Sequence, residues 1–123
     1  MSLVGEFGYK EWEDEIRLLG VDEYDKIIVA VCKDKIVGSM AYKKVDENVA
    51  ELKRIYIYKD FRGMGIAKDL YNKILETTKS QNYKKLMVET WENFQSGISF
   101  YYKNNFELVL KDDKRYVFML DLN

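Results

Sequence analysis

The stretch KDFRGMGIA, residues 59–67, separates two different sequence patterns and decides how the chain is organised. Before it, residues 49–58 form a strand-like run. After it, apolar residues from Ile66 onward recur at helical spacing, with charged residues filling the opposite face. The stretch itself is polar and carries Gly63 and Gly65. It therefore predicts a tight turn that leads from a strand directly into a helix.

Such a turn favours binding of a phosphate or pyrophosphate. The first N–H groups of a helix have no backbone partner and carry the positive end of the helix dipole, and glycines let a bulky anion approach them. A P-loop is excluded because no Lys-Ser or Lys-Thr pair follows these glycines at the required place. A dinucleotide fingerprint, with Glu89 as the ribose-binding acid, is disfavoured because Lys68 occupies the third glycine position and the chain is too short for two βαβαβ halves.

Upstream of the turn, short polar loops join three strand-like runs, and their close succession predicts an antiparallel arrangement. These runs are Ile27–Cys32, Ile36–Tyr42 and Val49–Tyr58. Before them, Tyr9 to Leu19 shows helical spacing among acidic residues, which predicts an amphipathic helix that ends at Gly20.

Downstream, the helix that begins at Ile66 ends at Asn82. We then expect a short buried strand, a second helix and a closing hairpin, at Leu86–Val88, Ser96–Asn104, and Phe106–Leu110 with Tyr116–Leu122. The strand–helix–strand unit implies one parallel crossover in an otherwise antiparallel sheet. The predicted fold class is therefore mixed α/β, or α+β. No linker or repeat divides residues 1–123 into more than one domain.

The composition limits the chemistry. The chain has 123 residues, no histidine and one cysteine, which excludes histidine-dependent nucleophile systems, histidine-bearing zinc sites and an intramolecular disulfide. Cys32 lies in an apolar run and is expected to be buried and inert, and no residue cluster suggests a metal. Acid–base chemistry must therefore come from carboxylates, tyrosines, lysines or water.

Charge and hydropathy set expectations about partners and location. A net charge of −1, with only short basic pairs, argues against nucleic acid, and no signal segment or long apolar run indicates a membrane protein. We expect a cytoplasmic protein. Residues 1–25 carry eight acidic side chains against two basic ones, which favours a cationic acceptor if this region helps to bind one.

The turn and its surroundings resemble the GCN5-related N-acetyltransferase (GNAT) superfamily. Arg62, Gly65 and Ala67 satisfy the acyl-CoA motif [QR]-x-x-G-x-[GA]. Residues 50–57 are similar to the family's central strand, and residues 98–107 resemble its "FYxKxGFE" signature. The resemblance runs in the same order from about Lys26 to Leu122. Asn105 stands where the family usually has glycine, and asparagine tolerates the left-handed conformation best among other residues. The N-terminus is shorter than is usual in the family.

The resemblance implies a central mixed sheet flanked by helices, and transfer of an acetyl group from acetyl-CoA to a primary amine of a small molecule or peptide. Transfer would be direct, in a ternary complex, without a metal, and a homodimer is plausible. Pyrophosphate would lie on the backbone of residues 62–67, and pantetheine would pair with the edge of residues 55–57 as an added strand does. The residues assigned to acetyl-CoA are Ile55, Tyr56, Ile57, Arg62, Gly63, Met64, Gly65, Ile66, Ala67, Asn93 and Tyr101.

Two catalytic residues follow from the same resemblance. Tyr101 is the candidate acid, because a phenol with a pKa near 10 is nearly matched to a thiolate whose conjugate acid has a pKa of about 8.5. Glu51 is the candidate base, on the same strand face as Ile55 by alternation, with Glu89 and Glu92 ranked behind it. A backbone amide near Ile55 would hold the oxyanion.

Purely structural roles stay open for these residues. Glu51 could be a strand glutamate paired with a lysine, and Tyr56, Tyr58, Trp91 and Phe94 could pack at the rim rather than line an acceptor pocket. The alternative function is a catalytically silent CoA-binding or dimer-forming module of the same fold.

Overall fold

The computed structural model describes residues 8–11 and 25–122, and these form one seven-stranded sheet with two helices. The strands are β1 (Gly8–Glu11), β2 (Lys26–Cys32), β3 (Lys35–Lys44), β4 (Val49–Ile57), β5 (Lys85–Trp91), β6 (Glu107–Asp112) and β7 (Arg115–Asp121). The helices are α2 (Ile66–Ser80) and α3 (Gln95–Lys103), and a 3-10 turn, η2, spans Lys59–Phe61. Neither helix of this described part is long and apolar enough to cross a membrane.

The strand order confirms the predicted class. The sheet runs β1-β2-β3-β4-β5-β7-β6, and every neighbouring pair is antiparallel except β4 and β5. Helix α2 makes the parallel crossover between those two strands. The closing hairpin forms as expected, with β7 placed beside β5 and β6 at the edge of the sheet.

The prediction of an N-terminal helix from Tyr9 to Leu19 is wrong for its first residues. Residues 9–11 belong to β1, which pairs with β2, and residues 12–19 lie outside the described residues. Tyr9 pairs with Ala30, and its hydroxyl donates a 2.7 Å hydrogen bond to Asp69 in α2. The pairing joins segments that are far apart in sequence, and so helical spacing within one segment does not reveal it.

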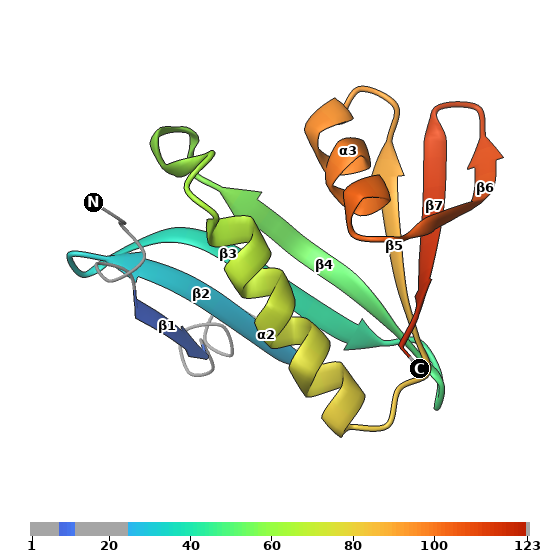
Figure 1. Cartoon of the computed structure of the whole chain (residues 1–123), viewed down its shortest axis with the longest axis horizontal. Helices are drawn as coiled ribbons and strands as arrows, with labels where there is room; N and C mark the ends of the chain where they lie inside the picture. Colours follow the sequence, from blue (N-terminus) through green and yellow to red (C-terminus); the bar gives the residue numbers. More distant parts are fainter. Residues whose placement is uncertain (1–7, 12–24, 123) are drawn as a thin grey trace.

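The core lies between the sheet and α2. Ile66, Leu70 and Ile74, which defined the helical pattern, are at most 1% exposed and pack against β-strand residues such as Met40 and Leu86. Figure 1 shows α2 lying across β2, β3 and β4 and α3 beside β5. Cys32 is partly buried rather than fully buried.

Strands β4 and β5 separate soon after they meet. Their parallel pairing covers only three residue pairs, from Val49 with Lys85 to Glu51 with Met87. Beyond this point the two strands splay apart into a V, which Figure 1 shows between β4 and β5. The open side of the V is where the predicted site residues gather.

Candidate active site

The turn before α2 exposes backbone that an anion can reach. Gly63 and Gly65 have φ angles of +77° and +83°, the left-handed region that favours glycine. A Cβ atom added at either position would meet nothing within 4 Å, so the space above the turn is open. Gly65 is the N-cap of the 15-residue helix α2, and its carbonyl accepts from the Asp69 N–H at 3.0 Å. The first amides of α2 therefore face open space, as a phosphate site requires.

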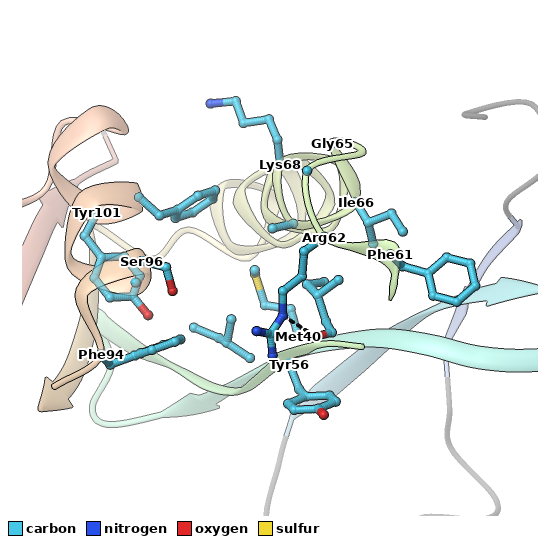
Figure 2. Close-up of a pocket in the computed structure, with 16 residues that line it drawn as sticks. Met40, Tyr56, Phe61, Arg62, Gly65, Ile66, Lys68, Phe94, Ser96 and Tyr101 are labelled. Carbon is cyan, nitrogen blue, oxygen red and sulfur yellow. Dashed lines mark hydrogen bonds between the residues drawn. The ribbon is translucent and has the colours of Figure 1, made fainter. Parts of the chain in front are cut away.

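A cavity of about 450 Å³ extends from this turn along β4 to α3. Figure 2 shows Arg62 and the start of α2 on one side of it and Tyr101 and Ser96 of α3 on the other. Nine of the residues assigned to acetyl-CoA line the cavity, namely Ile55, Tyr56, Ile57, Arg62, Gly63, Gly65, Ile66, Ala67 and Tyr101. The Tyr56 ring lies on the other side of β4 from the cavity (Figure 2), so this residue lines the cavity through its backbone.

The backbone of β4 faces this cavity along its open edge. The Nε of Arg62 donates to the carbonyl oxygen of Ile57 at 3.0 Å, whereas the N–H of Tyr58 donates to Val37 of β3 at 2.9 Å. Backbone groups of successive strand residues point to opposite edges, so Ile55 faces the same open edge as Ile57. Arg62 already uses the Ile57 carbonyl, and Ile55 is therefore the better placed of the two for pairing with a ligand.

A β-bulge in β4 changes which side chains share a face. Met40 of β3 stands opposite both Arg54 and Ile55, and Arg54 has a φ of +51°. The Ser39 hydroxyl donates to the Arg54 carbonyl oxygen at 2.7 Å and helps to hold the bulge.

The bulge overturns the expectation that Glu51 lies on the same face as Ile55. Before the bulge, Leu52 faces the core under α2, and Glu51 and Lys53 face the other side. After the bulge, Ile55 and Ile57 pack against that core. Glu51 is thus on the opposite face from both isoleucines.

A second cavity, of about 390 Å³, lies in the V between β4 and β5. Glu51 and Lys53 of β4 line it, as do Glu89 and Trp91 of β5. Ile55, Phe94 and Tyr101 line both cavities. These three residues therefore mark the place where the two cavities meet.

Tyr101 is held firmly at this junction. Its side chain is 2% exposed and packs against Phe106 and Phe118, with ring centroids 5.6 Å and 5.5 Å away. In Figure 2 it points from α3 into the first cavity toward the Phe94 ring. Burial raises the pKa of Tyr101 to about 12, which departs from the value near 10 expected from the sequence. The hydroxyl therefore keeps its proton throughout the neutral and moderately alkaline range.

Buried tyrosines make the protein sensitive to alkali. Burial raises the pKa of both Tyr71 and Tyr101 to about 12, whereas an unfolded tyrosine has a pKa near 10. Between these values the unfolded chain loses protons that the folded chain keeps, so the free energy of unfolding falls as pH rises. Between pH 9 and pH 11 we expect the free energy of unfolding of Tyr71→Phe to fall by about 1 kcal/mol less than that of wild type. Urea unfolding at the two pH values measures this difference. Equal losses in the two proteins would contradict this assignment.

The carboxylates of the second cavity are paired with cations. Lys53 Nζ lies 3.3 Å from Glu51 Oε2, and the Glu51 side chain is 13% exposed. Arg115 of β7 binds Glu89 side-on, with its Nε 2.9 Å and a terminal nitrogen 3.3 Å from the two carboxylate oxygens. Glu51 thus forms the ion pair with a lysine that was expected if its role were only structural, and it also lines the cavity.

Not every predicted residue reaches these cavities. Met64 packs against the core, and Asn93 is exposed in the turn before α3, so neither lines the cavities. Glu92 is likewise exposed and lines neither. Asn105 has a φ of +71°, the left-handed conformation expected where the family has glycine.

Several residues of the first cavity were missed from the sequence, and most of them lie in α3 or just before it. These are Met40, Phe61, Lys68, Ser96, Gly97 and Phe100, together with Phe94, which was considered only for the acceptor side. Lys68 had a usable signal, because it lies in the first turn of α2 beside the anion-binding turn. Its ammonium donates to the side-chain oxygen of Asn104 and so ties α2 to the end of α3.

Comparison with known proteins finds a family model that this chain matches. Residues 3–106 match the family model described as the acetyltransferase (GNAT) family. A 63-residue segment is 40% identical to N-acetylaspartate synthetase from Xenopus tropicalis, and covers 50% of this chain and 23% of that protein. The chain spans about a quarter of the length of the curated relatives it matches.

Solved structures share the fold at low sequence identity. Ard1 from Thermoplasma volcanium superposes with a TM-score of 0.84 at 17% identity, covering 94% of this chain and 97% of that one. A GNAT family acetyltransferase from Elizabethkingia anophelis, solved with acetyl-CoA bound, superposes with a TM-score of 0.77 at 14% identity, covering 94% and 98%.

Proposed function

The chain belongs to the acetyltransferase (GNAT) family, and from this premise we propose that it transfers an acetyl group from acetyl-CoA to a primary amine of a small molecule or peptide, directly within a ternary complex. The observation that carries the proposal is the meeting of two cavities at Ile55, Phe94 and Tyr101. One cavity begins at an anion-binding turn, and the other contains carboxylates that suit an ammonium group. A donor and an acceptor that enter from the two sides would meet at this junction.

Acetyl-CoA suits the first cavity from one end to the other. The diphosphate would lie on the first amides of α2, where Gly63 and Gly65 leave open space, with Arg62 adding positive charge. Pantetheine would follow β4 and pair with the backbone of Ile55. The thioester would then lie beside Tyr101.

The reaction needs few groups. The nitrogen lone pair of the neutral amine attacks the thioester carbonyl carbon, and the C–N bond forms as the carbonyl π electrons move to oxygen. The oxyanion collapses, the C–S bond breaks, and the sulfur leaves with the bonding electrons. The nitrogen loses one proton and the sulfur gains one, so the products are the N-acetyl amide and CoA with a free thiol. None of these steps requires the histidine that the chain lacks.

The residues at the junction take distinct roles in this scheme. Backbone N–H groups around the bulge near Ile55 would stabilise the oxyanion. The hydroxyl of Tyr101 would donate its proton to the departing sulfur. Burial raises the pKa of Tyr101, and the same desolvation raises the basicity of the thiolate, so donor and acceptor both remain suited to the transfer.

The second cavity supports an amine acceptor. Glu51 and Glu89 would attract an ammonium group, and either carboxylate would accept a proton directly or through water. A relative named N-acetylaspartate synthetase supports a small-molecule acceptor for this chain. Lys53 and Arg115 pair with these carboxylates and offset part of their charge, so this cavity suits a single ammonium group better than a polycation.

Replacing Glu51 tests the base. Glu51→Gln is expected to lower kcat about 100-fold at pH 7, and the deficit should shrink as pH rises toward the pKa of the free amine, because the amine then loses its proton without help. Glu89→Gln is the matched change in the same cavity. A pH–rate profile for both variants separates the two carboxylates, and a deficit for Glu51→Gln that is constant with pH would contradict its role as base.

The function itself is tested with an acceptor panel. The full chain is incubated with acetyl-CoA and amines, polyamines, amino acids and peptides, and release of free thiol is measured. Turnover that depends on the acceptor supports the proposal. Tight CoA binding without turnover of any acceptor would favour the silent CoA-binding module, and absence of CoA binding would overturn both.

A further inference from the structure

Phe94 carries an exposed aromatic ring on a backbone that is hydrogen-bonded on both sides. It is the residue before α3, and its side chain is 43% exposed. Its N–H donates to the Trp91 carbonyl oxygen at 2.9 Å, and its own carbonyl accepts from the Ile98 N–H at 3.1 Å. An apolar ring that is held in a cleft, instead of in the core, requires an explanation.

A glycine provides the space for this ring. A Cβ atom added at Gly97, in the first turn of α3, would lie 2.6 Å from both the Cδ2 and Cε2 atoms of Phe94. Real side chains do not approach so closely, so any residue larger than glycine would push the ring away from α3. The ring and the helix therefore fit together only because residue 97 is glycine.

The ring also forms a wall shared by the two cavities. Figure 2 shows Phe94 below the hydroxyl of Tyr101, at the α3 end of the first cavity. Together with Ile55 and Tyr101, it bounds the point where that cavity opens into the V between β4 and β5. With CoA in the proposed position, a group carried on its sulfur would lie against this wall.

We propose that Phe94 limits the length of the acyl group on the CoA thioester, so that acetyl fits and a four-carbon acyl chain does not. This inference rests on the proposed function, because it places an acyl-CoA in the first cavity. Butyryl has two more methylene groups than acetyl and would have to displace a ring whose backbone is held on both sides. A single methylene in an apolar pocket commonly changes selectivity about 10-fold or more.

Binding of CoA, acetyl-CoA and butyryl-CoA tests this role by isothermal titration calorimetry, without an acceptor. Wild type is expected to bind butyryl-CoA at least about 10-fold more weakly than acetyl-CoA. Phe94→Ala should reduce this difference to less than about 3-fold, when each thioester's affinity is compared with the affinity of the same variant for CoA. A wild type that does not discriminate, or a Phe94→Ala variant that keeps the full discrimination, overturns the proposal.

Gly97→Ala tests the ring contact separately. The added methyl group should drive the ring into the cavity and weaken acetyl-CoA binding, whereas in the Phe94→Ala background the same change should have no effect. If Gly97→Ala weakened acetyl-CoA binding equally in the two backgrounds, the proposed contact between the Phe94 ring and Gly97 would be overturned. Tyr102→Ala is the control, because it removes an aromatic ring of α3 that is 52% exposed and lines neither cavity. It should keep the wild-type selectivity.

The outcomes also separate this inference from the proposed function. If wild type discriminates against butyryl-CoA, Phe94→Ala does not, and no amine is acetylated, the proposed function fails and the assignment of Phe94 holds. If acetyl transfer occurs and Phe94→Ala leaves the selectivity unchanged, the function holds and the assignment fails. A chain that binds no CoA thioester overturns both.

Discussion

Tyr101→Phe is expected to lower kcat for acetyl transfer about 100-fold or more, while the affinity for CoA and the fold stay close to those of wild type. The change removes only the hydroxyl that would protonate the departing thiolate. The ring packs against Phe106 and Phe118 and would keep those contacts in the variant. Steady-state kinetics with a saturating acceptor, together with calorimetric titration of CoA, measures the two quantities.

The pH dependence adds a second readout for Tyr101. Burial holds the pKa of Tyr101 at about 12, so its proton is present well above neutral pH. The wild-type rate should rise as the amine loses its proton and should not fall before pH 10 through ionisation of Tyr101. An alkaline fall centred near pH 9 would assign the acid to another group.

Tyr102→Phe is the matched control for Tyr101. This neighbour is 52% exposed, packs edge-to-face against Phe118 with ring centroids 5.2 Å apart, and lines neither cavity. Loss of its hydroxyl should leave kcat unchanged. Similar kinetics for the two phenylalanine variants would remove Tyr101 from the reaction.

Gly65→Val is expected to weaken CoA binding about 100-fold, the loss of about two charge-assisted hydrogen bonds. The φ of Gly65 is +83°, a conformation that a β-branched residue adopts only with strain. Its side chain would also enter the open space above the first amides of α2, where the diphosphate would lie. Calorimetric titration of CoA measures the loss, and circular dichroism checks the fold.

Gly8→Val controls for the added side chain. A Cβ atom at Gly8 also meets nothing within 4 Å, but this glycine lies in β1 and lines neither cavity. Its affinity for CoA should equal that of wild type. If both variants bind CoA with wild-type affinity, the turn before α2 does not hold the diphosphate.

The elements that the sequence predicted correctly are those whose signals are local. Helix α2 and the turn before it follow from residues 63–75, and the left-handed conformation at Asn105 follows from a residue type that tolerates it. The prediction for the N-terminal segment was wrong because its structure depends on long-range contacts. Tyr9 begins a pattern of helical spacing, yet it lies in a strand because it can pair with Ala30 and bond to Asp69.

Within the candidate site, local sequence signals indicated the α2 side of the first cavity but not its α3 side. The turn before α2 needs only consecutive residues, and all of its residues that were assigned to acetyl-CoA except Met64 line the first cavity. The α3 side depends on Phe94 and Gly97, whose contact is visible only once the backbone of the turn before α3 is in place. Asn93, carried over by resemblance, points to the correct turn but lies one residue from the side chain that lines the cavities.

By itself the sequence determined the mixed sheet with one parallel crossover, the glycine turn that opens α2, and the absence of any histidine chemistry, because each depends on residue type and short-range spacing. Only the tertiary structure decided which side chains meet. The bulge at Arg54 depends on how β4 pairs with β3, and it places Glu51 on the opposite face from Ile55. The V between β4 and β5 brings Tyr101 to the junction of two cavities, because that juxtaposition depends on where separate strands stop pairing.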